Sequence, residues 1–162
     1  MATFQFEGID NYIAQLQKMY DDTDEIIGAA IYQGAAVVMK SVVSAIENIQ
    51  TDDRYGTLDD KKKGPTTYQK EGLRRAIGIA SLRNDGCFYN VKIGFDGYNG
   101  VKTKRWPNGQ PNAMVARSVE SGTSFMEKQP FMRKAESSSR VKCEQGMAKE
   151  IDKQLTQRVK ES

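Results

Sequence analysis

The chain has 162 residues, of which 38% are hydrophobic, and its 24 basic and 21 acidic side chains give a formal net charge of +3. This length and composition predict one folded domain over residues 1–162, and the near balance of charge argues against a dedicated nucleic-acid-binding protein. The chain contains no histidine, which excludes serine and cysteine hydrolases that use a histidine base.

Other chemistry-bearing residues do not form a recognisable site. The two cysteines, Cys87 and Cys143, lack metal-ligand spacing and are expected to be free thiols in a reducing cytoplasm. Acidic residues occur as neighbours in sequence, which suits helix caps and polar loops, and the glycines near residue 97 lack the order of a dinucleotide site. We therefore expect no enzyme activity, no cofactor and no metal.

The N-terminal part predicts a strand and two helices. Residues 3–6 alternate polar and aromatic side chains, and Ile9, Ile13 and Leu16 begin a helical spacing. Asp21, Asp22 and Asp24 offer an N-cap and an acidic first turn for a second helix. That helix carries a long apolar stripe: Ile27, Ile31, Ala35, Val38, Val42, Ala45 or Ile46, and Ile49. We interpret it as a core helix whose glycines and alanines permit close packing, and we expect neither a signal peptide nor an apolar segment of membrane-spanning length.

The middle of the chain predicts a β-hairpin. Residues 72–77 form an apolar turn that leads into strand-like segments at 77–83 and 87–95. Between these segments lie Asn84, Asp85 and Gly86, which tolerate the backbone of a tight turn. From Val91 onward apolar and polar residues alternate, so one face of the second strand should be buried.

Two polar loops, at about 51–70 and 96–111, flank this hairpin. Their basic residues could meet DNA phosphates or could be solvated loop tips; they are Lys61, Lys62, Lys63, Lys102, Lys104 and Arg105. Trp106 could stack on a base, but the enrichment of tryptophan in interfaces favours an anchor for the loop or for a neighbouring subunit.

The C-terminal part predicts a short helix at 112–120, a loop at 121–129 and a final helix with Pro130 as its first residue. Gly122 can end the short helix, Thr123 or Ser124 can bond free backbone groups, and Pro130 fixes the restart, so together they predict a rigid corner. The final helix has a narrow apolar stripe, which suits a helix only partly covered by its own domain: Met147, Ile151, Leu155 and Val159. The elements together predict an α+β fold in which a small antiparallel sheet packs against the two long helices.

Apolar side chains surround this corner and can be either core residues or exposed anchors for a partner. They are Phe125, Met126, Phe131 and Met132. The interface candidates of the chain are Trp106, Phe125, Met126, Phe131 and Arg133.

The tract from Val119 to Ala135 resembles the tail-completion, or head-tail joining, proteins of long-tailed bacteriophages. Both halves of the family pattern are present in order: an acidic residue and Gly-Thr at the end of a short helix, then Gln-Pro-Phe-Met-Arg before the last helix. The N-terminal strand, the alanine-rich helix and the Gly-Leu-Arg-x-x-Ile segment at 72–77 extend the resemblance over nearly the whole chain.

The resemblance implies a structural protein of the virion neck, assembled in the bacterial cytoplasm. It implies a ring of identical subunits, six in number, between the head connector and the tail tube, with packaged DNA passing through the lumen and no membrane contact. Alternatives are a tail terminator or head-closure protein of the same particle, a DNA-binding accessory protein that uses the basic loops, and a metal-dependent nuclease.

Overall fold

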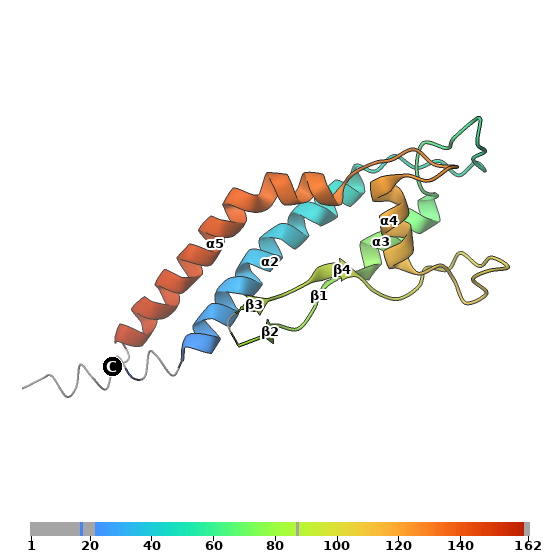
Figure 1. The fold of residues 1–162 in the computed structure, drawn as a ribbon. Coiled ribbons are helices and arrows are strands. Elements are labelled where there is room, and N and C mark those ends of the chain that lie inside the picture. The colour runs from blue at the N-terminus through green and yellow to red at the C-terminus, as the bar shows by residue number, and fades with distance from the viewer. Residues whose placement is uncertain (1–16, 18–21, 87, 161–162) are drawn as a thin grey trace, which may run out of the picture.

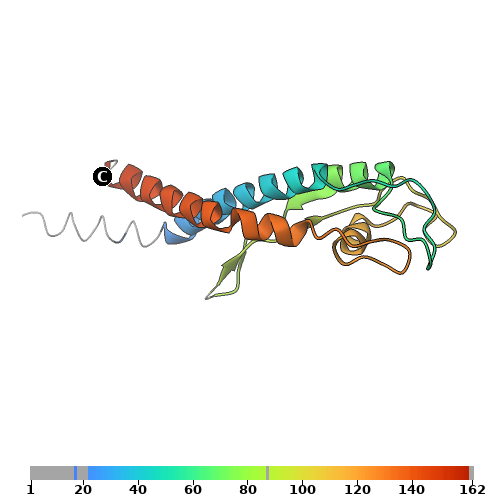
Figure 2. The ribbon, with the colours of Figure 1, turned by 90° about the horizontal axis from the view of Figure 1, so that it is seen from above.

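The computed structural model describes residue 17 and residues 22–86 and 88–160 of the chain. Two long helices, α2 and α5, lie side by side and extend away from a cluster of two short helices and two long loops (Figures 1 and 2). A small hairpin lies beside α2. The strand expected at 3–6 and the helix expected at 9–16 lie outside the described residues, as does Cys87.

α2 spans Thr23–Glu47 and is the long helix that the apolar spacing predicted. Asp24 and Glu25 lie in its first turn, where negative charge complements the helix dipole. Asp22 occupies the N-cap position, but its side chain makes no capping hydrogen bond. Its carboxylate pairs with Arg158 at 2.9 Å and so joins the two long helices, while its backbone carbonyl accepts from the N–H groups of Glu25 and Ile26.

By length and composition, α2 is also apolar enough to cross a membrane, with a mean hydropathy of 1.6 over 18 residues. This differs from the expectation that no apolar segment approaches such a length. The core helix of a folded domain passes the same test, and 33% of this window is buried in the chain. Within the described residues, seven residues of α2 are buried, most of its other apolar side chains are half-buried, and its exposed positions are mostly polar.

α5 spans Met132–Lys160 and packs antiparallel along α2 (Figure 1). Ser41 of α2 meets Ser138 of α5 near one end of the pair, and the ion pair of Arg158 closes the other end. Between them, a Cβ placed on Gly34 would lie 2.7 Å from Cγ of Met147. The small residues of α2 therefore allow close packing of the helices, as their content predicted.

The hairpin consists of two short antiparallel ladders. β1 (Ile77–Ile79) pairs with β4 (Ile93–Phe95), and β2 (Arg83–Asn84) pairs with β3 (Tyr89–Asn90). Gly86 has a φ of 85° in the turn, the left-handed conformation that the Asn-Asp-Gly sequence predicted. The hairpin is confirmed, but its strands are shorter than the sequence indicated.

The ladder is interrupted where the first strand turns toward α2. Ala80 still donates its backbone N–H to the carbonyl of Lys92, but the backbone N–H of Leu82 donates to the hydroxyl of Tyr32 on α2, at 2.9 Å. Leu82 also lies against Gly28, where an added Cβ would be 3.1 Å from its side chain. Anchoring to the helix therefore replaces strand pairing at this point.

The two short helices lie at the opposite end of the hairpin. α4 spans Asn112–Ser121, close to its predicted bounds. α3 spans Thr67–Ala76, so the predicted loop to residue 70 and turn at 72–77 are wrong: most of that turn is helix. Thr66 accepts from the backbone N–H of Gln69, whose side chain accepts from the backbone N–H of Thr66, and this capping box fixes the helix start.

The hydrophobic core lies where the C-terminal end of α2 meets α3, α4 and the start of α5. Its most deeply buried members are Val42, Ile46, Leu73, Val119 and Ala135. The rings of Phe95 and Phe131 pack edge to face, with centroids 5.9 Å apart, which joins the hairpin to the segment before α5. The architecture is α+β, with a small antiparallel sheet and two long packed helices.

Candidate functional site

The corner between α4 and α5 is built by local backbone geometry. Gly122 ends α4 with φ 75° and ψ 172°, a conformation open almost only to glycine. Thr123 then closes a tight turn: its N–H donates to the carbonyl of Met126, and its hydroxyl accepts from the N–H of Phe125. Gly122 and Thr123 thus turn the chain between α4 and the segment that leads to α5.

The start of α5 differs from the prediction, because Pro130 precedes the helix and is not its first residue. α5 begins at Met132, and the carboxylate of Glu120 accepts from the backbone N–H groups of Met132 (2.8 Å) and Arg133 (3.2 Å). The negative charge lies at the positive end of the helix dipole. A residue on α4 thus caps α5 across the corner and fixes the relation of the two helices.

Gln129 ties the corner to the loop at 48–66. Its backbone N–H donates to the carbonyl of Val119 at 2.8 Å. Its side-chain amide accepts from the N–H of Gln50 and donates to the carbonyls of Gln50 and Lys63, at 2.8–2.9 Å. Gly64 leaves room for this contact, since a Cβ there would lie 1.8 Å from the Gln50 carbonyl oxygen. The Gln129 side chain therefore joins the corner to both ends of the loop, at Gln50 and at Lys63.

The second half of the loop pairs directly with the corner. Lys62 donates its backbone N–H to the carbonyl of Phe125 and accepts from the N–H of Glu127, at 3.0 and 2.9 Å. Gly56 lies against the same Phe125 carbonyl, where an added Cβ would be 1.9 Å away. Burial lowers the pKa of the Lys62 amine, although Asp52 and Asp53 oppose that shift. The backbone of Lys62 therefore joins the loop to the corner, whereas the side chains of Lys61 and Lys63 are exposed.

Two acidic residues hold the first half of the loop. Asp52 accepts from the guanidinium of Arg54 and from the backbone N–H of Lys63, and these hydrogen bonds hold the pKa of its carboxyl far below the usual range. Asp53 accepts from the backbone N–H and the hydroxyl of Thr67, at 2.8 and 2.9 Å. The loop is thus long and polar, yet internally bonded.

The apolar residues of the corner divide into core and surface. Met126 and Phe131 are 6% and 3% exposed and belong to the core, so they offer no surface to a partner. Phe125 is 53% exposed, and the adjoining loop exposes Tyr55 (100%) and Leu58 (70%). We call these last three residues the apolar tip. Sequence reasoning found Phe125 but missed Tyr55 and Leu58, which stand alone among polar residues and carry no periodic signal.

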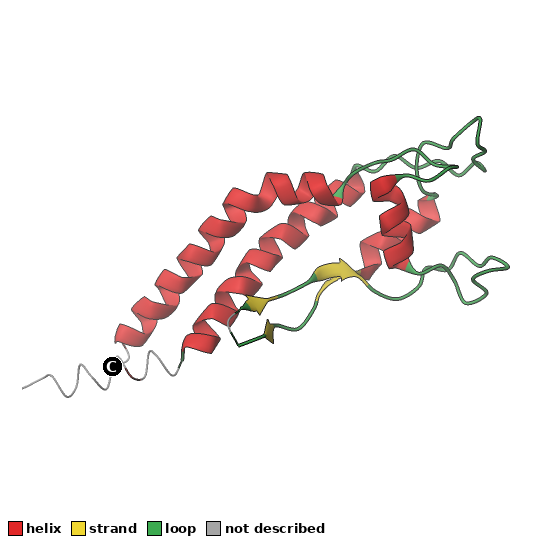
Figure 3. Cartoon of the chain, in the orientation of Figure 1, coloured by secondary structure: helices red, strands yellow, loops and turns green. Residues whose placement is uncertain are grey.

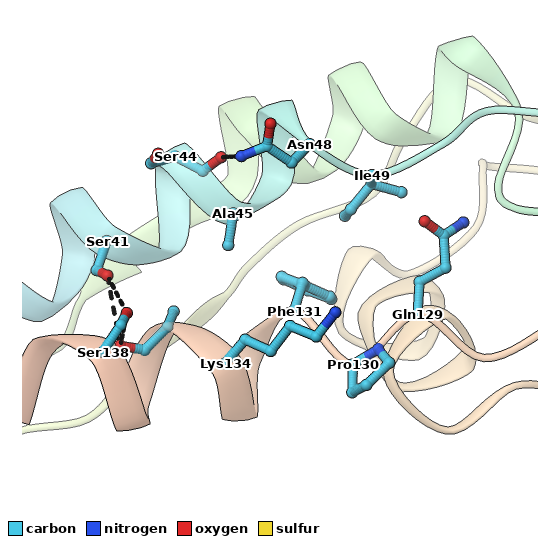
Figure 4. Close-up of a pocket in the computed structure, with 11 residues that line it drawn as sticks. Ser41, Ser44, Ala45, Asn48, Ile49, Gln129, Pro130, Phe131, Lys134 and Ser138 are labelled. Carbon is cyan, nitrogen blue, oxygen red and sulfur yellow. Dashed lines mark hydrogen bonds between the residues drawn. The ribbon is translucent and has the colours of Figure 1, made fainter.

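A cavity of about 320 Å³ lies beside the corner, between the end of α2 and the start of α5 (Figure 4). Ser41 bonds to Ser138 and to the carbonyl of Ala135, and Asn48 donates to the carbonyl of Ser44. Lys134 is the single charged side chain in its lining. The cavity therefore has no acid-base pair and offers a concave contact next to Gln129.

The loop at 96–111 lies at the same end of the molecule as the loop at 48–66 (Figure 3). Lys102, Lys104 and Arg105 are exposed, and Trp106 is half-buried beneath the guanidinium of Arg105, 5.7 Å from its ring centroid. Thr103 and Trp106 exchange backbone hydrogen bonds that close the turn between them. Arg133, the remaining interface candidate, is exposed at the start of α5.

No group of three or more His, Cys, Asp or Glu side chains that could hold a metal ion occurs within residues 22–86 and 88–160. Cys143 is a free, half-buried thiol on α5, and burial raises its pKa.

Comparison of the chain with known protein families, with curated proteins and with solved structures gives no match.

Proposed function

We propose that the chain is a structural subunit of the neck of a tailed bacteriophage or phage-like particle, where it forms a ring between the head connector and the tail tube. The observation that supports this best is the apolar tip. Phe125 belongs to the tract that resembles tail-completion proteins, and that tract is bonded to the loop carrying Tyr55 and Leu58. Large apolar side chains on a bonded, rigid support are typical anchors for a protein partner.

Half-buried apolar side chains on α2 support assembly of several copies. In the part of the chain that the structure describes, α2 has seven buried residues, and further apolar side chains on it are half-buried: Ile27, Ile31, Val37, Val38, Met39 and Val43. A ring of identical subunits needs two different contact surfaces on each subunit. The apolar tip and these half-buried residues of α2 are separate surfaces that would serve this purpose, and a ring of six is our expectation.

The basic loops suit the same proposal and also a rival one. The exposed side chains of Lys61, Lys63, Lys102, Lys104 and Arg105 come from two loops at one end of the molecule. In a ring they would lie near DNA in the lumen, while in a DNA-binding accessory protein they would bind phosphates directly. Only the accessory protein requires salt-sensitive DNA affinity of the isolated chain, at micromolar concentration or tighter.

The experiment that tests the proposal has two parts. Light scattering gives the mass of the purified chain in solution, and antibody labelling with electron microscopy locates the chain on any particle that contains it. We expect a ring or a monomer, with label confined to the head-tail junction; label at the tail side or the head side of the junction separates a tail terminator from a head-closure protein. A chain absent from particles and retained on DNA at moderate salt would contradict the proposal.

A further inference from the structure

A second cavity, of about 300 Å³, lies between α3 and the beginning of the loop at 96–111. Two tyrosines from different segments, Tyr68 and Tyr98, line it and are 62% and 65% exposed. Two asparagines, Asn99 and Asn112, also line it but are only 6% and 4% exposed. The cavity thus combines an aromatic, accessible rim with buried carboxamides.

In each buried carboxamide, one of the two polar atoms is hydrogen-bonded and the other is not. The Oδ1 atom of Asn99 accepts from the backbone N–H groups of Val101 (2.9 Å) and Gln110 (3.3 Å), and Nδ2 of Asn112 donates to the carbonyl of Asp96 (2.9 Å). These bonds fix the orientation of both amides. Nδ2 of Asn99 and Oδ1 of Asn112 have no hydrogen-bond partner among the described residues. The site therefore presents one free donor and one free acceptor.

Both asparagines lie against Gly72 of α3. A Cβ on Gly72 would be 2.8 Å from Cβ of Asn99 and 3.0 Å from Oδ1 of Asn112. Buried polar atoms without partners destabilise a fold, and nearly all such atoms in folded proteins have partners. A group that both accepts and donates would satisfy both atoms together.

The charges of the lining favour a neutral ligand. Glu71 and Arg75 neutralise each other through a 2.9 Å ion pair on α3. The remaining charged lining residue is Asp96, whose carboxylate accepts from the backbone N–H of Gly97. An anion would meet this carboxylate, and a cation would leave the donor of Asn99 unsatisfied.

We propose that this cavity binds a primary carboxamide, supplied by an asparagine or glutamine side chain of a bound polypeptide. Its carbonyl oxygen accepts from Nδ2 of Asn99, and its NH₂ group donates to Oδ1 of Asn112. A primary amide presents both groups on one edge, whereas the C=O and N–H of a trans main-chain amide point to opposite sides. The exposed rings of Tyr68 and Tyr98 then contact the flanking residues of the polypeptide.

Both free amide atoms are sealed from solvent, so the ligand must displace part of the cavity lining to reach them. We assign this movement to Tyr68, whose ring lies on Gly100 at the same cavity, where an added Cβ would be 2.8 Å from its Cε1 atom. Because Tyr68 is itself mostly exposed, it can rotate outward without breaking the core. This site is independent of the proposed ring and is tested on the isolated chain.

The test is an NMR titration of the ¹⁵N-labelled full chain, in which the side-chain NH₂ resonances of Asn99 and Asn112 are followed. Propionamide should shift both with a dissociation constant in the millimolar range, as expected for so small a ligand. N-methylacetamide, which reaches only one of the two atoms, should bind about ten-fold more weakly. Acetyl-Gly-Gln-Gly N-methylamide should bind more tightly than propionamide, and its Glu counterpart should not bind.

Asn99→Asp removes the donor and keeps the acceptor that holds the loop, so it should abolish the response. Asn108→Asp adds the same charge at an exposed position of the loop and serves as the matched control. The proposal is overturned if neither resonance of the wild-type chain responds to propionamide, or if the Gln and Glu peptides act alike. A long-lived water at the two amides that propionamide does not displace would overturn it as well.

Discussion

Replacing Gln129 with alanine tests whether this side chain holds the corner and the loop together. The change removes three hydrogen bonds to the backbone of Gln50 and Lys63. Each is worth about 1 kcal/mol, and water can partly replace them because both partner residues are exposed, so we expect a loss of about 2–3 kcal/mol. For a chain of this length, that loss lowers Tm by about 4–12 °C.

The assay is urea unfolding followed by circular dichroism, with Gln145→Ala as the control. Gln145 is exposed on α5, and its replacement should leave stability nearly unchanged. Gln129→Glu places a carboxylate against two carbonyl oxygens and should be at least as destabilising as alanine at neutral pH. A loss below about 0.5 kcal/mol for Gln129→Ala, the range of an ordinary surface substitution, would refute this account of the corner.

Three further predictions concern the same region. Glu120→Gln removes the negative charge that caps α5 and should cost about 1 kcal/mol in urea unfolding; an unchanged midpoint would show that the cap is not needed. Because the pKa of Asp52 is lowered in the folded chain, its carboxylate contributes fully to stability above about pH 4, where an unfolded aspartate titrates, and this contribution is lost as the pH falls below that value. Asp52→Asn should therefore flatten the acidic part of a curve of Tm against pH. Parallel curves for the variant and the wild-type chain would contradict this. Phe125→Ala should weaken particle assembly with little change in Tm, whereas Phe131→Ala should cost about 3–5 kcal/mol in stability; an equal fall in Tm for both would show that Phe125 is no surface anchor.

Periodic patterns predicted the elements whose burial decides their structure. α2 follows from its apolar spacing, and the hairpin follows from Asn-Asp-Gly between two apolar segments. α3 was missed because Leu73 is its one fully buried side chain, so it leaves little periodic trace in a polar sequence. The Thr66 and Gln69 capping box was its available signal.

Long-range contacts determine the start of α5 and the burial of the corner residues, which sequence patterns did not predict. Pro130 is a good first residue for a helix, but α5 begins two residues later, where Phe131 has entered the core and Glu120 of α4 supplies the cap. The tract that resembles phage proteins contains the turn at Gly122 and Thr123. Its sequence did not show that Met126 would be buried and Phe125 exposed, because that division depends on pairing with Lys62.

The capped corner holds one end of α5. Its 29 residues extend about 43 Å from Met132 to Lys160, and near the far end Arg158 pairs with Asp22 and Glu25 at the start of α2. Because α5 packs along α2 between these two ends, the corner and the ion pairs of Arg158 with Asp22 and Glu25 belong to one continuous helix pair. A partner that bound Phe125 would therefore meet a surface held in place by contacts at both ends of that pair.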